Sequence, residues 1–301
     1  DMLERGYTMH HAISQDKQGN ILATVSKTSA KIANGKDVRI NDFIIRMDPE
    51  KGEILQEWDL VNMLDSARYG MTDYNLTADP YAQNASNWAH NNGIVEWGND
   101  YLATARYQGI FKFNKAGGIE WIISPHGYWR DRYLKLLLNP LHADGTPITD
   151  PDVIAGTKNC DDFEWPWGCH TAVPLPNGHI FYFNNGYGRN FKLDFTDRKN
   201  VYTCGIEYEV DEVNRTVRQV WQYGKERGTA YFTPARSGVQ YLEQTGNRLI
   251  CPGMSNVLSN GNRGARVTEV DPETQEIVFE LELEDAIYQR VYRMSLYPDN
   301  Q

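Results

Sequence analysis

One pattern of hydrophobic and polar positions occurs four times along the chain. In each copy, two runs rich in β-branched and aromatic residues flank a polar turn, and two more runs flank a turn with Asp, Asn or Gly. The copies begin near His11, His90, His170 and Gly238, and a glycine follows eight residues later in each, at Gly19, Gly98, Gly178 and Gly246. Each copy predicts a meander of four antiparallel strands, and their repetition predicts an all-β protein, a β-propeller with one blade to a copy.

Helical periodicity is confined to segments that connect the copies. Residues 60–69 and 129–138 have it, and together with residues 140–169 they predict helical and loop inserts between blades, stacked on one rim of the propeller. Residues 291–298 are typical of one strand of a further blade. The chain 1–301 is thus interpreted as one propeller domain with four blades and a closing strand, and we expect further blades to precede it in the full protein.

Composition narrows the possible partners. The 301 residues include 40 acidic and 30 basic side chains, a net charge of −10, and 41% are hydrophobic, as in a folded protein. No run reaches the roughly 18 apolar residues of a membrane helix, so no membrane span is expected. The acidic balance argues against a nucleic-acid partner, which needs a basic surface. Any anionic ligand would have to meet a local cationic site.

The four cysteines do not have the spacing of a zinc site, so we expect no zinc bound through them. Cys160 and Cys169 are near enough in sequence to close a short loop as a disulfide. The alternative is that they are small buried hydrophobic residues. The sequence leaves this pairing open.

The repeat aligns three histidines. The first strand of a propeller blade lines the central channel, so His11, His90 and His170 occupy equivalent channel-facing positions and are expected to converge. The fourth copy has Gly238 at this position, which shows that the blade itself does not require histidine. His10 would point to the opposite strand face from His11 and is interpreted either as a residue that supports the site without touching the ligand or as a structural one.

Polar residues suited to an anion accompany the histidines. Sixteen residues after the start of the first two copies lie Lys27 and Arg106. The planar guanidinium of Arg106 suits a tetrahedral oxyanion, whereas Lys27 is equally well explained as a solvated charge at a strand edge. Asn92 follows His90 by two residues and shares its strand face, so both side chains can contact one ligand.

The residues alone leave three functions open. Three imidazoles from three strands suit a metal ion, as in a metal-dependent propeller lyase or hydrolase, and they equally suit covalent catalysis at a nitrogen. Arg106 and the lack of a carboxylate in register with the histidines disfavour a cation. A non-catalytic binding propeller is the third alternative, since a fold does not define a function.

Motifs along nearly the whole chain carry a family resemblance. They are MHHAI at 9–13, NWAHNNGI at 87–94, ATARYQG at 103–109, IEWIISPHGYW at 119–129, WPWGCHTA at 165–172, FNNGYGR at 183–189 and NRTVRQVWQYGKERG at 214–228. On these motifs the chain resembles the bacterial arylsulfate sulfotransferases that do not use phosphoadenosine phosphosulfate. The resemblance implies a six-bladed catalytic propeller preceded by a small β-domain, with a homodimer through that N-terminal region as an open expectation. It also implies cofactor-free transfer of a sulfuryl group from a phenolic sulfate donor to a phenol acceptor, in the periplasm, through a sulfated histidine.

The resemblance assigns roles to residues. His170, in the CHTA segment, matches the nucleophile, and His11, His90, Asn92 and Arg106 match the residues around it. A sulfuryl group in transfer carries charge on its nonbridging oxygens, which Arg106 and Asn92 would hold. His11 or His90 would protonate the leaving phenolate and deprotonate the acceptor phenol.

Residues at the mouth of the site are expected to bind the aryl group. The candidates for stacking against it are Tyr107, Tyr187, Trp165 and Trp167, although aromatic residues in a propeller more often pack within blades. The fourth copy departs from the family, because Arg236, Ser237 and Gly238 stand where its members carry Thr-Ser-Asn. This departure puts the family's threonine contact in doubt and adds Arg236 as a cation at the rim.

Overall fold

Antiparallel strands make up most of the regular structure. The computed structural model describes residues 2, 4–34, 37–68, 88–255, 258 and 260–285. Within these residues the strands form four separate sheets, and each sheet contains four strands that are hydrogen-bonded to one another in chain order. The predicted all-β class and the four-stranded meander in each copy are therefore confirmed.

Each sheet corresponds to one copy of the sequence pattern. The first contains β1 (Tyr7–Gln15), β2 (Ile21–Asn34), β3 (Asp37–Met47) and β4 (Ile54–Asp59), and the second contains β5 (Asn91–Trp97), β6 (Asp100–Ala105), β7 (Gly109–Phe113) and β8 (Ile119–Ile123). The third contains β10 (His170–Pro174), β11 (Ile180–Asn184), β12 (Cys204–Asp211) and β13 (Thr216–Tyr223). The fourth contains β14 (Ser237–Tyr241), β15 (Arg248–Pro252), β16 (Gly264–Val270) and β17 (Ile277–Glu284).

The turn between the first two strands of each sheet accounts for the four aligned glycines. Gly19, Gly98, Gly178 and Gly246 have φ values of 86°, 65°, 84° and 76°. Glycine adopts this left-handed conformation without the steric penalty of a Cβ atom, which is why each hairpin turns at the same place.

The inserts between the sheets contain less helix than the sequence predicts. The described helices are α1 (Leu60–Met63), α2 (Asp131–Leu134), α3 (Pro151–Ala155) and α4 (Gly228–Tyr231), with short 3₁₀ turns η2 (Arg189–Phe191), η3 (Arg198–Asn200) and η4 (Lys225–Arg227). The predicted helix at 129–138 stops early because the chain after α2 pairs with β8: the Ile122 amide donates to the Leu136 carbonyl, and the Leu138 amide donates to the Ile122 carbonyl.

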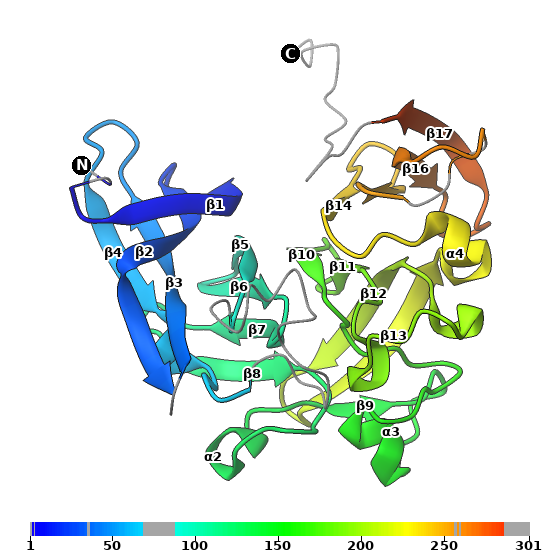
Figure 1. Ribbon diagram of the computed structural model, residues 1–301, viewed down its shortest axis with the longest axis horizontal. Coiled ribbons are helices and arrows are strands. Elements are labelled where there is room, and N and C mark those ends of the chain that lie inside the picture. Colours follow the sequence, from blue (N-terminus) through cyan, green and yellow to red (C-terminus); the bar gives the residue numbers. More distant parts are fainter. Residues whose placement is uncertain are drawn as a thin grey trace.

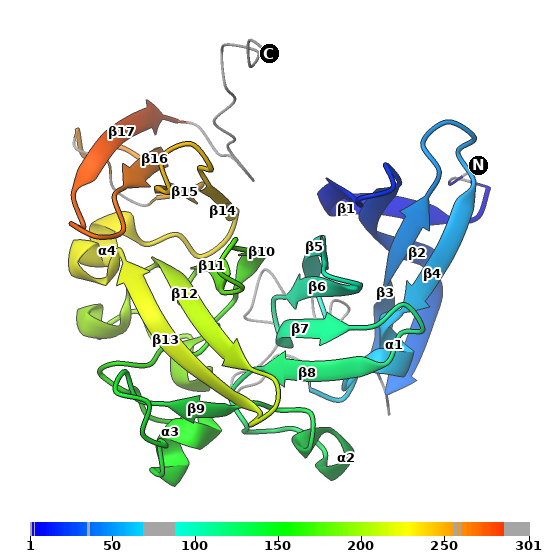
Figure 2. The ribbon, with the colours of Figure 1, turned by 180° about the vertical axis from the view of Figure 1, so that it is seen from behind.

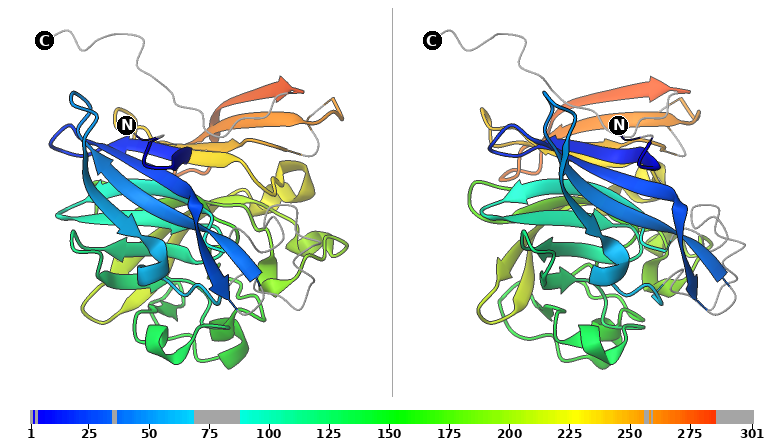
Figure 3. Two further views of the ribbon diagram at one scale, coloured as in Figure 1. Left: turned by 60° about the vertical axis from the view of Figure 1, so that its left-hand side comes forward. Right: turned by 90° about the vertical axis from the view of Figure 1, so that its left-hand side faces the viewer.

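The insert after α2 joins the outer edges of two sheets. Its strand β9 (Asn139–Leu141) pairs in parallel with β13, the last strand of the third meander. Figure 3 shows the green segments that contain α2, α3 and β9 together at one end of the molecule. The described part of this insert therefore extends the sheet edges, and its stacking on a propeller rim stays a prediction.

The four sheets follow one another around an arc, with their first strands in contact. β1 contacts β5, β5 contacts β10 and β10 contacts β14. Figure 1 shows these strands toward the inside of the arc, and Figure 2 shows the same order from behind, with the first sheet (blue) and the fourth (orange to red) at its two ends. Polar residues on the first strands of neighbouring sheets are thus brought together.

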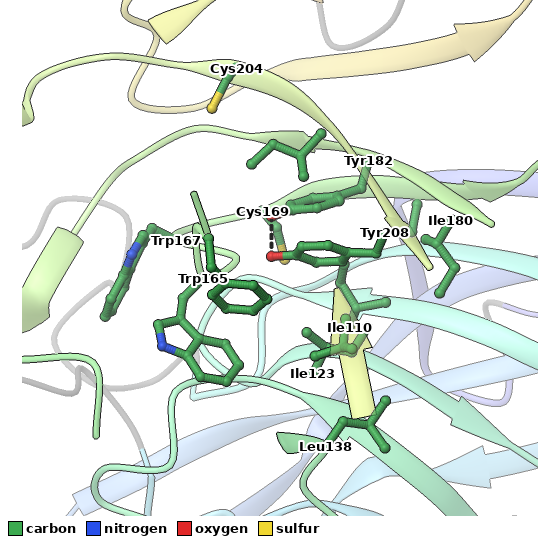
Figure 4. Close-up of a cluster of buried hydrophobic side chains, with 14 of the residues drawn as sticks. Ile110, Ile123, Leu138, Trp165, Trp167, Cys169, Ile180, Tyr182, Cys204 and Tyr208 are labelled. Atoms are coloured by element: carbon green, nitrogen blue, oxygen red, sulfur yellow. Dashed lines mark hydrogen bonds between the residues drawn. The ribbon is translucent and has the colours of Figure 1, made fainter. Parts of the chain in front are cut away.

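Both faces of the inner sheets are buried, as their weak alternation of polar and apolar residues indicates. On β11, Ile180 and Tyr182 pack in the cluster shared with the second sheet, while Phe181 and Phe183 pack in the cluster shared with the fourth. Figure 4 shows the first of these clusters, where the Tyr182 hydroxyl donates to the Tyr208 hydroxyl at 2.8 Å. This packing on both sides fixes the third sheet, which carries His170.

Among the described residues, no helix is long and apolar enough to cross a membrane. The strand predicted at residues 291–298 lies outside the described residues.

Candidate active site

The structure brings the three aligned histidines together. His11 lies on β1, His90 directly precedes β5 and His170 begins β10. The Nε2 atoms of His11 and His90 are 3.1 Å apart, and the ring centroids of His11 and His170 are 6.4 Å apart. The convergence expected from the register is confirmed, while the catalytic roles of these histidines stay predictions.

The backbone is irregular where the histidines lie. His11, His90 and Arg236 have φ values of 52°, 53° and 62°, in the left-handed region that side chains disfavour. The pairing register shifts at the same places, between Met9 and Ile13 and between Asn91 and Gly93. Each such residue costs on the order of 1–3 kcal/mol, and residues of this kind are concentrated at functional sites.

His170 is held in one protonation form by Asn185. Its Nδ1 lies 2.5 Å from the Asn185 Oδ1, while the Asn185 Nδ2 donates to the Thr233 carbonyl at 2.8 Å and the Ser237 hydroxyl at 3.0 Å. Because Oδ1 can only accept, the Nδ1 of His170 carries the proton and Nε2 keeps its lone pair. Asn185 was missed from the sequence, although it lies within the quoted FNNGYGR segment.

The three histidines are neutral at ordinary pH. Burial, with the nearby charge of Arg106, lowers the pKa of His170 to about 3. Desolvation by the surrounding side chains also lowers the pKa of His11, although part of this residue is exposed, with a further lowering by His10 and an opposing effect of Asp42. The pKa of His90 falls well below 6.5, again mainly because of burial. Neutral imidazoles can act as nucleophiles and bases.

Arg106 is the cation closest to these rings. It follows β6, is 1% exposed, and its backbone amide donates to the His90 carbonyl at 3.0 Å. Its Nη2 donates to the Pro234 carbonyl at 2.7 Å, and its Cζ lies 4.6 Å from the centre of the Tyr187 ring. A buried guanidinium held between two sheets favours an anion beside the histidines and repels a metal cation.

Asn92 joins the second sheet to the segment that enters β10. Its Nδ2 donates to the Cys169 carbonyl at 2.8 Å, and its Oδ1 accepts from the Thr104 hydroxyl at 2.7 Å. Gly93 is required beside it, because a Cβ there would lie 2.3 Å from the Thr104 Oγ1. The amide is thus oriented before any ligand binds.

The four predicted stacking residues are all buried, and Trp165 and Trp167 pack in the core cluster shared by the second and third sheets. Tyr107 is 3% exposed, with its ring edge-on to His90 at 6.1 Å between centroids. Tyr187 is 6% exposed and lies beneath the Arg106 guanidinium. In this structure the two tyrosines pack around the cation and the histidine, so stacking against an aryl group stays a prediction.

The two predicted cations at the edge of the site lie differently. Arg236 is exposed, and its positive charge is near enough to lower the pKa of His11. Lys27 pairs with Glu57 at 3.1 Å and lies over the Phe43 ring at 4.6 Å. In the pairing of β1 with β2, Lys27 lies opposite Tyr7, four residues before His11. This is because β1 begins before the register shift between Met9 and Ile13. In this structure Lys27 therefore forms an ion pair within the first sheet, and its contact with a substrate stays a prediction.

The histidines do not form a metal-binding group. Among the described residues, one group of three side chains has potential ligand atoms within 4.8 Å of one another. It is formed by His142, Cys160 and Asp162 and includes none of the three histidines. There the Asp162 carboxylate already accepts from His142 at 3.0 Å and from the Cys160 thiol at 3.1 Å. Cys160 and Cys169 are both free thiols in this structure.

Neutral imidazoles at the first strands of three neighbouring sheets, with the buried guanidinium of Arg106 beside them, define the candidate site of this all-β protein. The chain belongs to the arylsulfotransferase (ASST) family, whose model matches residues 1–293. The resemblance deduced from the sequence motifs is therefore confirmed.

Two curated relatives match nearly all of the chain. An arylsulfate sulfotransferase AssT from Escherichia coli O6:H1 is 28% identical over 99% of this chain and 54% of its own length, and one from Lelliottia amnigena has the same identity and coverage. The chain thus spans about half the length of these relatives. A solved structure described as a candidate 6-phosphogluconolactonase from Bacteroides uniformis covers 96% of this chain and 77% of its own, at a TM-score of 0.39 and 12% identity, too distant to bear on the fold or the function.

Proposed function

We propose that the protein is an arylsulfate sulfotransferase that transfers a sulfuryl group from a phenolic sulfate ester to a phenol, through a sulfated His170. The observation that carries the proposal is the contact between His170 and Asn185, which leaves the Nε2 lone pair available beside Arg106. Membership of the arylsulfotransferase family supports the substrate class.

In the first half-reaction, the Nε2 of His170 attacks the sulfur of the ester. The N–S bond forms as the bond between sulfur and the aryl oxygen breaks, and the aryl oxygen takes a proton and leaves as a phenol. The His170 ring becomes positive, and its Nδ1–H bond to the Asn185 Oδ1 strengthens because the donor is now charged. Arg106 and the Asn92 amide would hold the nonbridging oxygens.

The proton for the leaving group comes from a histidine that gains it on substrate binding. An anionic sulfate ester stabilises an imidazolium beside it and so raises the pKa of His11 or His90 from the low values of the ligand-free site. In the second half-reaction the acceptor phenol returns its proton to the same histidine, its oxygen attacks sulfur, and the N–S bond to His170 breaks.

The proposal extends to the whole protein. A six-bladed propeller would close the arc of four meanders, and the family resemblance supports a periplasmic location. Fractionation of cells of the source organism tests the location: recovery of the protein with cytoplasmic markers would contradict it.

Trapping the intermediate tests the mechanism. The protein is incubated with 4-nitrophenyl sulfate and no acceptor, then analysed by intact-mass spectrometry, with and without a chelator. We expect one acid-labile sulfuryl adduct that persists with the chelator and is absent in His170→Ala. The matched control is His179→Ala, because His179 also has its Nδ1 bound, to Glu207 at 2.6 Å, on a turn away from the site. An unmodified protein that forms no adduct, or loses it with the chelator, contradicts the proposal.

A further inference from the structure

A chain of polar contacts runs from the candidate site to a buried carboxylate. The His11 Nε2 lies 3.1 Å from the His90 Nε2, and the His11 Nδ1 lies 3.0 Å from the His10 Nδ1. The His10 Nε2 lies 3.5 Å from the Asp42 Oδ1, which is no hydrogen bond but is near enough for the carboxylate charge to favour a proton on that nitrogen. Asp42 is 3% exposed, and its Oδ2 accepts from the backbone N–H of Asn91 at 3.1 Å.

The irregular backbone of β1 makes this chain of contacts. In a regular strand, consecutive side chains point to opposite faces, so His10 and His11 would lie apart. The left-handed φ of His11, 52°, and the register shift between Met9 and Ile13 turn the two rings toward each other. The sequence-based expectation that His10 points away from His11 is therefore wrong. The left-handed backbone at His11 is what brings the two rings into contact.

The carboxylate gives the chain a direction. A hydrogen bond between two imidazole nitrogens needs one donor and one acceptor, and an ionised carboxylate only accepts. Asp42 therefore favours the proton on the His10 Nε2, which leaves the His10 Nδ1 to accept from the His11 Nδ1–H. The His11 Nε2 then keeps its lone pair and accepts from the His90 Nε2–H.

We infer that His10 and Asp42 are positioning residues that make His11, rather than His90, the proton donor and acceptor of sulfuryl transfer. This inference rests on the proposed function. The charged groups that face His11 are His10, Asp42, Arg106 and Arg236, and among them Asp42 is the one that stabilises an imidazolium. The largest charge effects on His90 come from His11, Arg106, His170 and His10, and each of these four opposes a positive charge on its ring.

The proton balance is simple. When an aryl oxygen replaces His90 as the partner of the His11 Nε2, the His11 imidazolium gives its Nε2 proton to that oxygen as the S–O bond breaks. Its Nδ1–H stays directed at His10, whose own proton stays directed at Asp42. In the acceptor half-reaction the phenol proton returns to the His11 Nε2 as the N–S bond breaks, and His10 and Asp42 end unchanged.

Dependence on the leaving group separates this role from a structural one. A proton donor matters most when the leaving phenolate is a strong base, so phenyl sulfate needs it more than 4-nitrophenyl sulfate does. We expect His10→Gln and Asp42→Asn to lower kcat with phenyl sulfate by about tenfold or more, and with 4-nitrophenyl sulfate by less than about threefold. In Asp42→Asn the amide Nδ2 would also face the His10 Nε2 and reverse the direction of the chain.

The matched control is His179→Gln, which removes a histidine from the His179–Glu207 pair on the turn between β10 and β11. It should change neither rate. Equal losses with both substrates, or no loss with either, in His10→Gln overturn the inference even if Asp42→Asn does not fold. Failure of the proposed function has a different signature, because the unmodified protein would then form no sulfuryl adduct.

Discussion

Replacement of Asn185 by leucine tests how the structure prepares His170. Leucine has nearly the same shape as asparagine but can neither accept from the His170 Nδ1 nor donate to the Thr233 carbonyl and the Ser237 hydroxyl. Asn185→Leu therefore keeps the packing of the third sheet and removes the contacts that fix the His170 ring and its protonation form.

The size of the effect follows from the charge that develops on His170. A hydrogen bond between neutral groups contributes about 0.5–1.5 kcal/mol to stability, and one to a charged group about 1.5–3 kcal/mol. The Nδ1–H bond therefore gains about 1–1.5 kcal/mol as Nε2 bonds to sulfur, which is about tenfold in rate. A ring displaced by about 1 Å loses up to about 100-fold more. We expect kcat to fall by about 10- to 1,000-fold, with little change in KM.

A single-turnover measurement of 4-nitrophenolate release without acceptor isolates this step. Asn247→Leu is the matched control, because Asn247 is a buried asparagine whose Nδ2 donates to Glu269 at 2.7 Å in the fourth sheet, away from the site. Each variant should lose on the order of 1–3 kcal/mol of stability for buried groups left unsatisfied. If Asn185→Leu is folded and releases 4-nitrophenolate within threefold of the unmodified protein, the role of Asn185 is refuted.

Further predictions concern the cation, a packing position and pH. Arg106→Lys keeps the positive charge but should lower kcat by about tenfold or more. An ammonium cannot replace the planar guanidinium, which donates to a carbonyl and stacks on Tyr187. Steady-state kinetics of the variant and the unmodified protein check this. Gly93→Ala should reduce both stability and kcat, because the new Cβ would lie 2.3 Å from the Thr104 Oγ1. Chemical denaturation and turnover measurements check this. The control is Ala116→Ser at an exposed position, which should change neither quantity. Burial lowers the pKa of His170 from 6.5 to about 3, so unfolding takes up a proton at pH values between these two. The contribution of neutral His170 to stability is therefore full above pH 6.5 and is lost as the pH falls toward 3. The unmodified protein should lose more stability than His170→Gln between about pH 7 and pH 4 by denaturant titration, and equal losses would contradict this assignment.

Much of the fold was accessible from local patterns. The aligned glycines predict the hairpins because only a residue without a Cβ adopts their φ freely, and the paired β-rich runs predict the strands on either side. The predicted helix at 129–138 failed where the backbone groups of Leu136 and Leu138 found partners on Ile122 of β8. A local periodicity cannot anticipate such a competitor from another part of the chain.

The candidate site divides in the same way. Its three histidines follow from equal positions on equivalent strands, because the first strands of successive sheets pack side by side. Lys27 occupies the position equivalent to Arg106 in the sequence, yet an earlier start of β1 places it beside Glu57. One shift in register is enough to separate two residues that the sequence aligns.

The sequence by itself determined the repeated meander, the turn positions and the meeting of His11, His90 and His170, because these depend on periodicity and on the conformational freedom of glycine. The tertiary structure alone decided which groups orient those rings. Asn185 reaches His170 from just beyond the neighbouring strand β11. The left-handed backbone at His11 brings its ring to His10, which lies beside Asp42 of β3. Such contacts depend on single irregular φ angles and on distant segments packed together, and no repeat in the sequence records them.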